Sequence, residues 1–396
     1  MPNKRKKILY ILAGLGIYLL ATGISYGAFT ALARGSIFTS PLPAGQEEGE
    51  ESADRKALID ITGPKNETCL LNGAKFTKAE KNVWETRRPL AVMIENHEES
   101  RPQSGLTDAD IVYEAVAEGG ITRFMGLYYC QAAAYELILG PVRSARTYFL
   151  DWASEYNFPL YVHVGGANTP GPANALGQIT TYGWSAANDL NQFSIGFPTF
   201  WRDYERLGRT VATEHTMYST TEKLWAVGKK RGYTSEGPEG EQWSDAFKPW
   251  EFTADEADFA DRGDLTSIDY NFWDDSAYEV SWQYDKEGNF FKRFNGGQPH
   301  QDLNLDQQLT AKNVVIQFAS ERNANDGYPG NVHLVYGTTG TGKALIVIDG
   351  KTVEGSWAKS SRLSRTIFYD ESGKEIAFNP GKIWISVLPI GTQVDY

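Results

Sequence analysis

The first half of the sequence places charged side chains next to predicted strand and helix ends. Arg143 and Arg146 flank Ser144 at the predicted start of a helix. A guanidinium group is a planar fork that matches phosphate or carboxylate, and a helix N-terminus favours anions. The pattern predicts an anion-binding site, and its candidate residues are Arg101, Arg123, Arg143, Ser144 and Arg146.

Acid–base chemistry would require a carboxylate or an imidazole beside these cations. Glu95, Glu118 and His163 near predicted element ends are candidates for that role, and so is His215 in the segment Glu214-His215-Thr216. No nucleophile motif such as G-x-S-x-G accompanies them, so the sequence names candidates without naming a reaction. The competing interpretation is structural, because the arginines could pair with neighbouring glutamates in an ion-pair network. The sequence leaves both interpretations open.

Two familiar site motifs are incomplete. Residues 337–344 read GTTGTGKA, which is close to a phosphate-binding P-loop but ends in Ala344 instead of a hydroxyl residue. A predicted strand follows, whereas a P-loop opens a helix. We therefore predict no nucleotide binding. The five histidines show no metal-ligand spacing such as HExxH, so the sequence predicts no metal and no other cofactor.

The chain is acidic overall. It has 396 residues, with 38 Lys and Arg against 50 Asp and Glu, and a net charge of -12. Nucleic-acid binding requires basic surface, so the charge argues against it. Residues 236–287 hold 16 of the acidic residues together with several Trp and Tyr. We expect a solvated, acidic and aromatic-rich connector there.

The N-terminus predicts attachment to a membrane. Residues 8–33 are uncharged and largely apolar, and four cations precede them. As a helix this run would span about 39 Å, enough to cross a bilayer. The cations predict a single-pass anchor in the cell membrane with a cytoplasmic N-terminus and an extracytoplasmic remainder. A cleaved signal peptide is the alternative, because residues 31–33 read ALA.

Export bears on the two cysteines, because disulfides persist outside the cytoplasm. A bridge between Cys69 and Cys130 would close a loop of about 60 residues and stabilise the fold by roughly 4 kcal/mol. Two free buried thiols are the alternative. We predict the disulfide.

Local signals predict both helices and strands. A capping box at Thr77 predicts a helix over 79–85, and a similar pattern at 107–110 predicts a second helix whose apolar face includes 111–116. Further helices are predicted at 144–156 and 220–231. Predicted strands lie at 90–94, 123–129, 160–164, 314–318, 332–336, 344–348, 367–369, 375–378 and 383–388, with a hairpin turn at Asp349-Gly350.

The predicted fold class is α+β, on a single N-terminal transmembrane helix. An α/β layered first domain precedes a second domain that is mostly antiparallel β. The predicted segments are a cytoplasmic tip (1–7), the anchor (8–33), an acidic stalk (34–68), the α/β domain (69–235), the connector (236–287) and the β-rich domain (288–396).

Several long motifs resemble one family. They read RPLAVMIEN (88–96), RPQSGL (101–106), ADIVYE (109–114), EGGITRF (118–124) and GPVRSAR (140–146), followed by AKNVV (311–315), GSW (355–357) and NPGKIWI (379–385). Together these resemble the YerB-like family, which are bacterial envelope proteins with paired N- and C-terminal domains of unknown function. The resemblance covers roughly residues 69–390. It implies a layered fold and an exported, membrane-tethered protein, and it implies no activity.

Two functional hypotheses follow. The first is a membrane-tethered extracytoplasmic envelope protein that binds a cell-wall glycopolymer or an envelope protein. The alternative is a phosphotransferase-like enzyme acting on anionic or lipid-diphosphate-linked glycan. In it Arg143, Arg146 and Arg123 hold phosphate, while Glu95 or Glu118 holds a metal or acts as the base. The sequence leaves open whether the protein is an enzyme.

Overall fold

The computed structural model describes residues 54–254, 256–329 and 333–396. The predicted cytoplasmic tip and transmembrane anchor, and most of the predicted stalk, lie outside these residues. Within the described part of the chain, no helix is long and apolar enough to cross a membrane. Strands far outnumber helices there, which agrees with the β-rich side of the predicted fold class.

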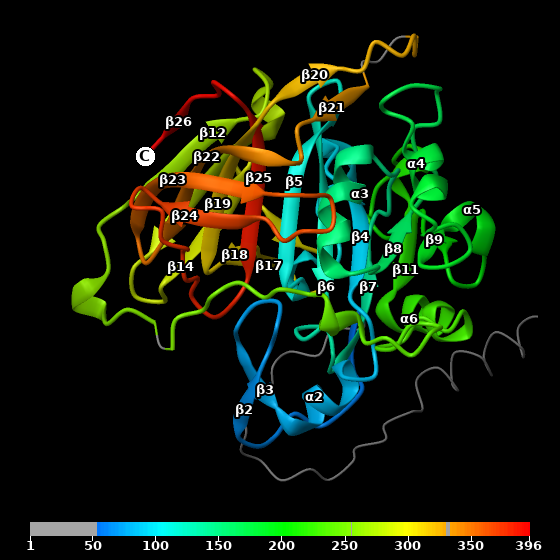
Figure 1. Cartoon of the computed structure of the whole chain (residues 1–396), viewed down its shortest axis with the longest axis horizontal. Helices are drawn as coiled ribbons and strands as arrows, with labels where there is room; N and C mark the ends of the chain where they lie inside the picture. The colour runs from blue at the N-terminus through cyan, green and yellow to red at the C-terminus, as the bar shows by residue number, and fades with distance from the viewer. Residues whose placement is uncertain (1–53, 255, 330–332) are drawn as a thin grey trace, which may run out of the picture. The chain divides into compact units, whose positions relative to one another are not determined.

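A ten-stranded mixed sheet forms the centre of the molecule (Figure 1). From one edge to the other its strands are β24 (Ile367–Asp370), β23 (Lys351–Lys359), β22 (Gly340–Ile348), β19 (Asn313–Ala319), β25 (Ile383–Pro389), β5 (Ile111–Glu118), β6 (Ile121–Tyr128), β4 (Leu90–Glu95), β8 (Leu160–His163) and β9 (Asp189–Asn191).

Both halves of the chain contribute to this one sheet. Strand β25, near the C-terminus, pairs in parallel with β5, and the register sets Ile383 opposite Ile111 and Ser386 opposite Glu114. On its other side β25 pairs in parallel with β19. The first and second halves therefore share a continuous hydrogen-bonded core rather than meeting only through side chains.

Smaller sheets surround the central one. One contains β12 (Ser267–Asn271), β13 (Glu279–Asp285), β14 (Phe290–Asn295), β15 (Gln298–Pro299), β18 (Thr310–Ala311) and β26 (Val394–Asp395). A four-stranded sheet contains β1 (Arg55–Ala57), β7 (Tyr135–Leu139), β11 (Met217–Thr220) and β10 (Trp201–Arg202). Three strand pairs complete the set: β2 (Lys65–Thr68) with β3 (Lys75–Thr77), β16 (Gln301–Asp302) with β17 (Gln307–Gln308), and β20 (Glu321–Asn323) with β21 (Leu334–Tyr336).

The described α-helices are short: α2 (Lys78–Trp84), α3 (Thr147–Ala153), α4 (Ala175–Thr181), α5 (Gln192–Ile195) and α6 (Thr221–Lys230). Thr77 caps α2 in a complete capping box with Glu80, as its sequence predicts. Helix α3 packs against the central sheet, where Trp152 stacks on Tyr113 of β5 at 5.8 Å between ring centroids.

The predicted helix over 111–116 is wrong, because these residues form β5. Every residue from Ile111 to Ala117 is buried, since β5 lies in the middle of the sheet and is covered on both faces. Such strands are continuous apolar runs without alternation, which a helical pattern can mimic. Residues 375–378 likewise form isolated bridges, not the predicted strand, whereas the turn at Asp349-Gly350 does join β22 to β23.

Two predicted connecting segments contain paired strands. Within the predicted stalk, β1 pairs with β7 and β2 pairs with β3. Within the predicted connector, β12 and β13 pair with each other across five residue pairs. The acidic side chains of these strands alternate with buried aromatic ones such as Tyr270 and Trp282. Alternation of this kind is typical of a strand with one buried face.

A buried ion pair joins the β12–β14 sheet to the central sheet. Both side chains of Glu114 on β5 and Arg293 on β14 are fully buried, and Nη2 of Arg293 donates to the carboxylate at 2.9 Å. The guanidinium lies over the ring of Trp384, at 4.5 Å from its centroid. Trp384 and Thr122 also donate hydrogen bonds to Glu114. The charge pair therefore sits in an aromatic enclosure that both halves of the chain build.

His300 extends this buried network. Its Nδ1 accepts a hydrogen bond from Nε of Arg293 at 2.9 Å, and its Nε2 lies 2.7 Å from Oε1 of Gln103. The first contact requires an unprotonated Nδ1. The ring proton is therefore on Nε2, which donates to Gln103, and the ring is neutral. Burial, together with the charges of Arg293 and Arg101, holds the pKa of His300 well below its ordinary value.

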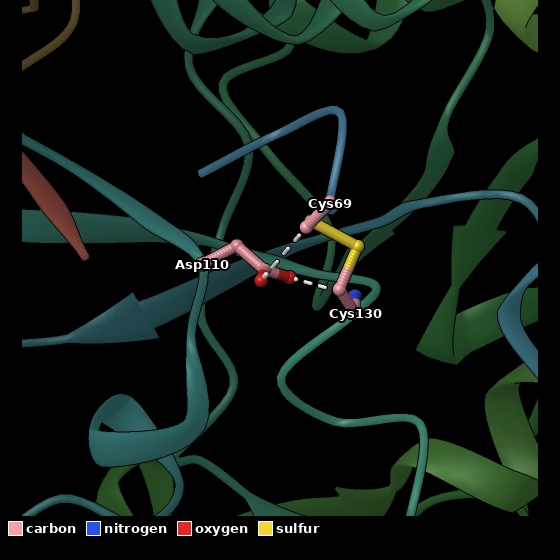
Figure 2. Close-up of side chains that lie close together, drawn as sticks. All are labelled: Cys69, Asp110 and Cys130. Atoms are coloured by element: carbon pink, nitrogen blue, oxygen red, sulfur yellow. Dashed lines mark hydrogen bonds between the residues drawn. A yellow bond between two sulfur atoms is a disulfide. The ribbon is translucent and has the colours of Figure 1, made fainter. Parts of the chain in front are cut away.

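The predicted disulfide is confirmed. Cys69 and Cys130 are bonded, with 6.0 Å between their Cα atoms (Figure 2). The bridge ties the β2–β3 hairpin to the end of β6. Asp110 lies beside it and accepts hydrogen bonds from the backbone N–H groups of Tyr129 and Cys130. Burial raises the pKa of Asp110 to about 7, against the lowering effect of these N–H groups.

The Glu114→Gln variant should destabilise the fold by about 3–5 kcal/mol, because it leaves the buried charge of Arg293 without a counter-ion. Denaturant unfolding measures this change in the free energy of unfolding. Glu371→Gln is the matched control, since Glu371 is exposed. Equal stability of the two variants would contradict the role we assign to the ion pair.

Acid should destabilise the protein through His300. Below about pH 6.5 the unfolded chain gains a proton at this residue, whereas the folded chain keeps the ring neutral, so stability falls as pH falls. The contribution reaches at most about 1.4 kcal/mol per pH unit. Between pH 7 and pH 5, the free energy of unfolding should fall more steeply with falling pH for wild type than for His300→Gln. The same pH dependence in both proteins would refute the role that we assign to His300.

Candidate functional site

Parallel strands bring several predicted site residues to one edge of the central sheet. Strands β4, β8 and β9 run in the same direction and pair in that order. Their last residues are Glu95, His163 and Asn191. In open sheets the carboxyl ends of parallel strands are the usual place for ligands.

Glu95 connects two of the other predicted residues. Its side chain is buried, and its Oε1 accepts a hydrogen bond from Nε of Arg143 at 2.8 Å. Its Oε2 lies 2.8 Å from Nδ1 of His215. Burial acts to raise the pKa of Glu95, but His215 and Arg143 outweigh it and hold the pKa below its ordinary value. The same hydrogen bond raises the pKa of His215.

A pocket of about 600 Å³ with both polar and apolar lining residues lies beside Arg143. It lies at the carboxyl ends of β8 and β9, and Arg143 and Ser144 form one wall. Arg202 supplies a second guanidinium and Glu214 a carboxylate. The other lining residues are Val164, Gly165, Gly166, Asn168, Leu176, Asn191, Phe193 and Met217. We call this the carboxyl-end pocket.

The rim of this pocket carries an exposed aromatic ring. The side chain of Phe193, at the start of α5, is 76% exposed. Gly165 has φ +57°, and a Cβ atom there would come within 2.9 Å of the Phe193 ring. The position therefore favours glycine both for its backbone and for the space that the ring occupies. An exposed ring above this pocket provides a flat apolar surface for a ligand.

Arg123 and Arg146 do not line the pocket. Both are buried and both pair with Glu118, through Nη2 of Arg123 at 3.2 Å and through Nη2 of Arg146. Arg123 also donates to the backbone oxygen of Ser144 at 2.8 Å. Burial lowers the pKa of both arginines. The three side chains thus form an ion-pair cluster, and through Arg123 this cluster holds the backbone of Ser144 beside the pocket.

His163 and Arg101 hold other parts of the structure. The ring of His163 is buried, with Nδ1 at 2.6 Å from the oxygen of Gly165 and Nε2 at 2.5 Å from Asp189. It therefore fixes the loop that forms the pocket floor. Arg101 binds the side chain and backbone oxygen of Asn96 and lies 5.1 Å from the ring centroid of Tyr278. Of the predicted anion ligands, Arg143 and Ser144 line the carboxyl-end pocket.

Sequence reasoning missed Arg202, Asn191 and Phe193. Arg202 lies on β10, a two-residue strand, and no apolar run of useful length marks it. Asn191 ends a three-residue strand and then caps α5. An exposed aromatic between an Asn cap and a glycine, as in Asn191 to Gly196, is the one local signal that could have been recognised.

Fold and site define a mixed-sheet protein in which two half-chains share one core and a pocket opens at the carboxyl ends of parallel strands. The model of the "Protein of unknown function (DUF3048) N-terminal domain" matches residues 76–234, and that of the corresponding C-terminal domain matches 268–385. The chain belongs to this family, which confirms the YerB-like resemblance.

Two relatives support the assignment. The "Putative lipoprotein YerB" of Bacillus subtilis (strain 168) is 30% identical over 313 residues, which is 79% of this chain and 84% of that relative. The crystal structure of the YerB protein from Bacillus subtilis matches with a TM-score of 0.66 at 25% identity, over 84% of this chain and 100% of that one.

Replacing Glu118 should destabilise the fold more than it changes the pocket surface. Glu118→Gln leaves Arg123 and Arg146 buried without a counter-ion, at an expected cost of about 2–4 kcal/mol. Because the Glu118 side chain is 20% exposed, this is less than for a fully buried pair. Thermal unfolding against the exposed control Glu239→Gln measures the effect. An unchanged Glu118→Gln midpoint would show that the cluster adds nothing.

Proposed function

We propose that this protein acts at the bacterial cell envelope, attached to the membrane through its N-terminal segment. The B. subtilis relative is described as a lipoprotein. The two cysteines of this chain are bonded to each other, so neither offers a free thiol for lipid attachment. The apolar run at 8–33 is then the element suited to attachment, with the remainder outside the cytoplasm.

The ligand that best fits the carboxyl-end pocket is an anionic wall polymer. The single observation behind this proposal is that Arg143 and Arg202 both line one pocket. Nε of Arg143 donates a hydrogen bond to Glu95. This bond fixes the plane of the guanidinium group, which lines the pocket. Guanidinium groups held in this way suit phosphate or carboxylate groups spaced along a polymer. The exposed Phe193 ring could then pack on a sugar.

The enzymatic alternative lacks this kind of support. A lipid-diphosphate transferase would require Arg143 and Arg146 to hold one phosphate. Arg146 is instead buried against Glu118, and its Nη1 donates to the backbone oxygen of Ala145. We therefore propose binding rather than group transfer at this pocket.

Binding of poly(glycerol phosphate) teichoic acid to the full chain tests the proposal. Arg202→Gln should weaken binding about tenfold, because Arg202 is exposed and its loss removes a charge from the pocket. The variant also loses the hydrogen bonds of Arg202 to Thr213 and Thr216, so circular dichroism checks its fold. Arg143→Gln should weaken it further, and added salt should weaken wild-type binding. The measurement is a co-sedimentation or calorimetric titration, with neutral dextran as the uncharged polymer.

Arg322→Gln is the matched control, because Arg322 is an exposed arginine on β20 and does not line the pocket. It should bind like wild type. The proposal fails if wild type binds teichoic acid no better than dextran. It also fails if Arg322→Gln and Arg202→Gln lose the same affinity, since binding would then follow overall charge.

A further inference from the structure

Two imidazoles and a carboxylate lie close together near Glu95, whose Oε2 contacts one of the imidazoles. They belong to His97, Glu99 and His215, and one ligand-capable atom from each lies within 4.8 Å of the others. His97 caps the 3-10 turn η1 (Glu98–Ser100), which contains Glu99, and His215 ends the 3-10 turn η4 (Thr213–His215). Two short turns from distant parts of the sequence thus present three metal-ligand side chains to one another.

A hydrogen bond to Glu95 fixes the orientation of the His215 ring. Its Nδ1 lies 2.8 Å from Oε2 of the buried Glu95, so Nδ1 carries a proton, and in the neutral ring Nε2 keeps its lone pair. That Nε2 lies 3.7 Å from Oε2 of Glu99. A carboxylate on the far nitrogen is the usual partner of a metal-binding histidine, because it sets the tautomer and makes the ring a stronger ligand.

His97 lies directly over His215. Their rings stack with 4.7 Å between centroids and 22° between planes. Nδ1 of His97 accepts a hydrogen bond from the backbone N–H of Glu99 at 3.1 Å. Ligation through Nε2 would place the ring proton on Nδ1 and give up this capping bond. His97 is only partly buried and Glu99 is 57% exposed, so both side chains have room to turn toward a shared ion.

The charges around the three side chains are compatible with a cation. Arg143 pairs with Glu95, and Glu99 adds a negative charge. Arg209 and Arg143 are opposing cations: Nη2 of Arg209 donates to the backbone oxygen of Glu99 at 3.0 Å, and the charge of Arg143 acts on His215. Glu98 and Glu214 belong to the same two turns and add negative charge. The other group with metal-ligand side chains, Cys69, Asp110 and Cys130, is excluded because its two sulfurs are bonded to each other.

We propose that His97, Glu99 and His215 bind one divalent transition-metal ion of the zinc type. Two imidazole nitrogens with one carboxylate oxygen suit such ions, whereas Ca²⁺ and Mg²⁺ prefer oxygen ligands throughout. Three protein ligands leave a fourth position for water. With zinc–ligand bonds of about 2.0–2.2 Å, the ligand atoms must draw together by roughly 1 Å on binding. Glu95 then positions both this site and Arg143 of the carboxyl-end pocket.

Zinc titration of the full chain tests the proposal, with the metal alone as the probe. Isothermal titration of Zn²⁺ should show one site per chain, and Co²⁺ should give visible absorption bands of a site with nitrogen and oxygen ligands. Glu99→Gln and His97→Ala should each weaken Zn²⁺ binding at least tenfold. Both residues are partly or largely exposed, so the variants are expected to fold, which circular dichroism checks.

Glu98→Gln is the matched control, because it removes the same charge from the same turn but not from the ligand group. It should bind Zn²⁺ like wild type. The proposal is overturned if wild type binds no zinc at micromolar concentrations. It is equally overturned if Glu98→Gln weakens binding as much as Glu99→Gln. Teichoic acid binding is measured separately, so either proposal can fail without the other.

Discussion

The buried pair of Glu114 and Arg293 is the constraint around which the molecule is arranged. Two charges taken out of water are tolerated only when each satisfies the other and the remaining polar atoms find partners. Arg293 can reach Glu114 only if β14 crosses the face of β5, and the enclosing ring of Trp384 arrives only if β25 pairs beside β5. One interaction thus makes the two halves of the chain depend on each other.

This dependence explains which parts of the fold could be predicted. The capping box at Thr77, the strand at 90–94 and the turn at Asp349-Gly350 are determined by contiguous residues, and sequence reasoning found them. The helix predicted over 111–116 was wrong because a continuous buried run was taken for the apolar face of a helix, and the partner of Glu114 that marks the buried strand was not known. That partner lies 179 residues away, beyond any local pattern.

The candidate site was predictable in its residues but not in its groupings. Glu95 and Arg143 were identified from element ends and His215 as a candidate base, and the structure joins them through the two oxygens of Glu95. Which side chains face solvent depends on the parallel order of β4, β8 and β9, and that order is a property of the whole sheet. Arg123 and Arg146 carry the same motif signals as Arg143, yet Glu118 holds them in the interior.

The position of β25 has a consequence for how the chain reaches its fold. Ribosomes make β5 early and β25 almost last, yet the two are neighbours in the middle of the sheet. Until residues 383–389 exist, β5 has one open edge with unpaired backbone groups, and open edges recruit other strands. From the completion of β6 until β25 is made, the nascent first half therefore remains an incomplete sheet with one edge that can pair with other strands. A C-terminal truncation that removes β25 would leave this edge of β5 open permanently.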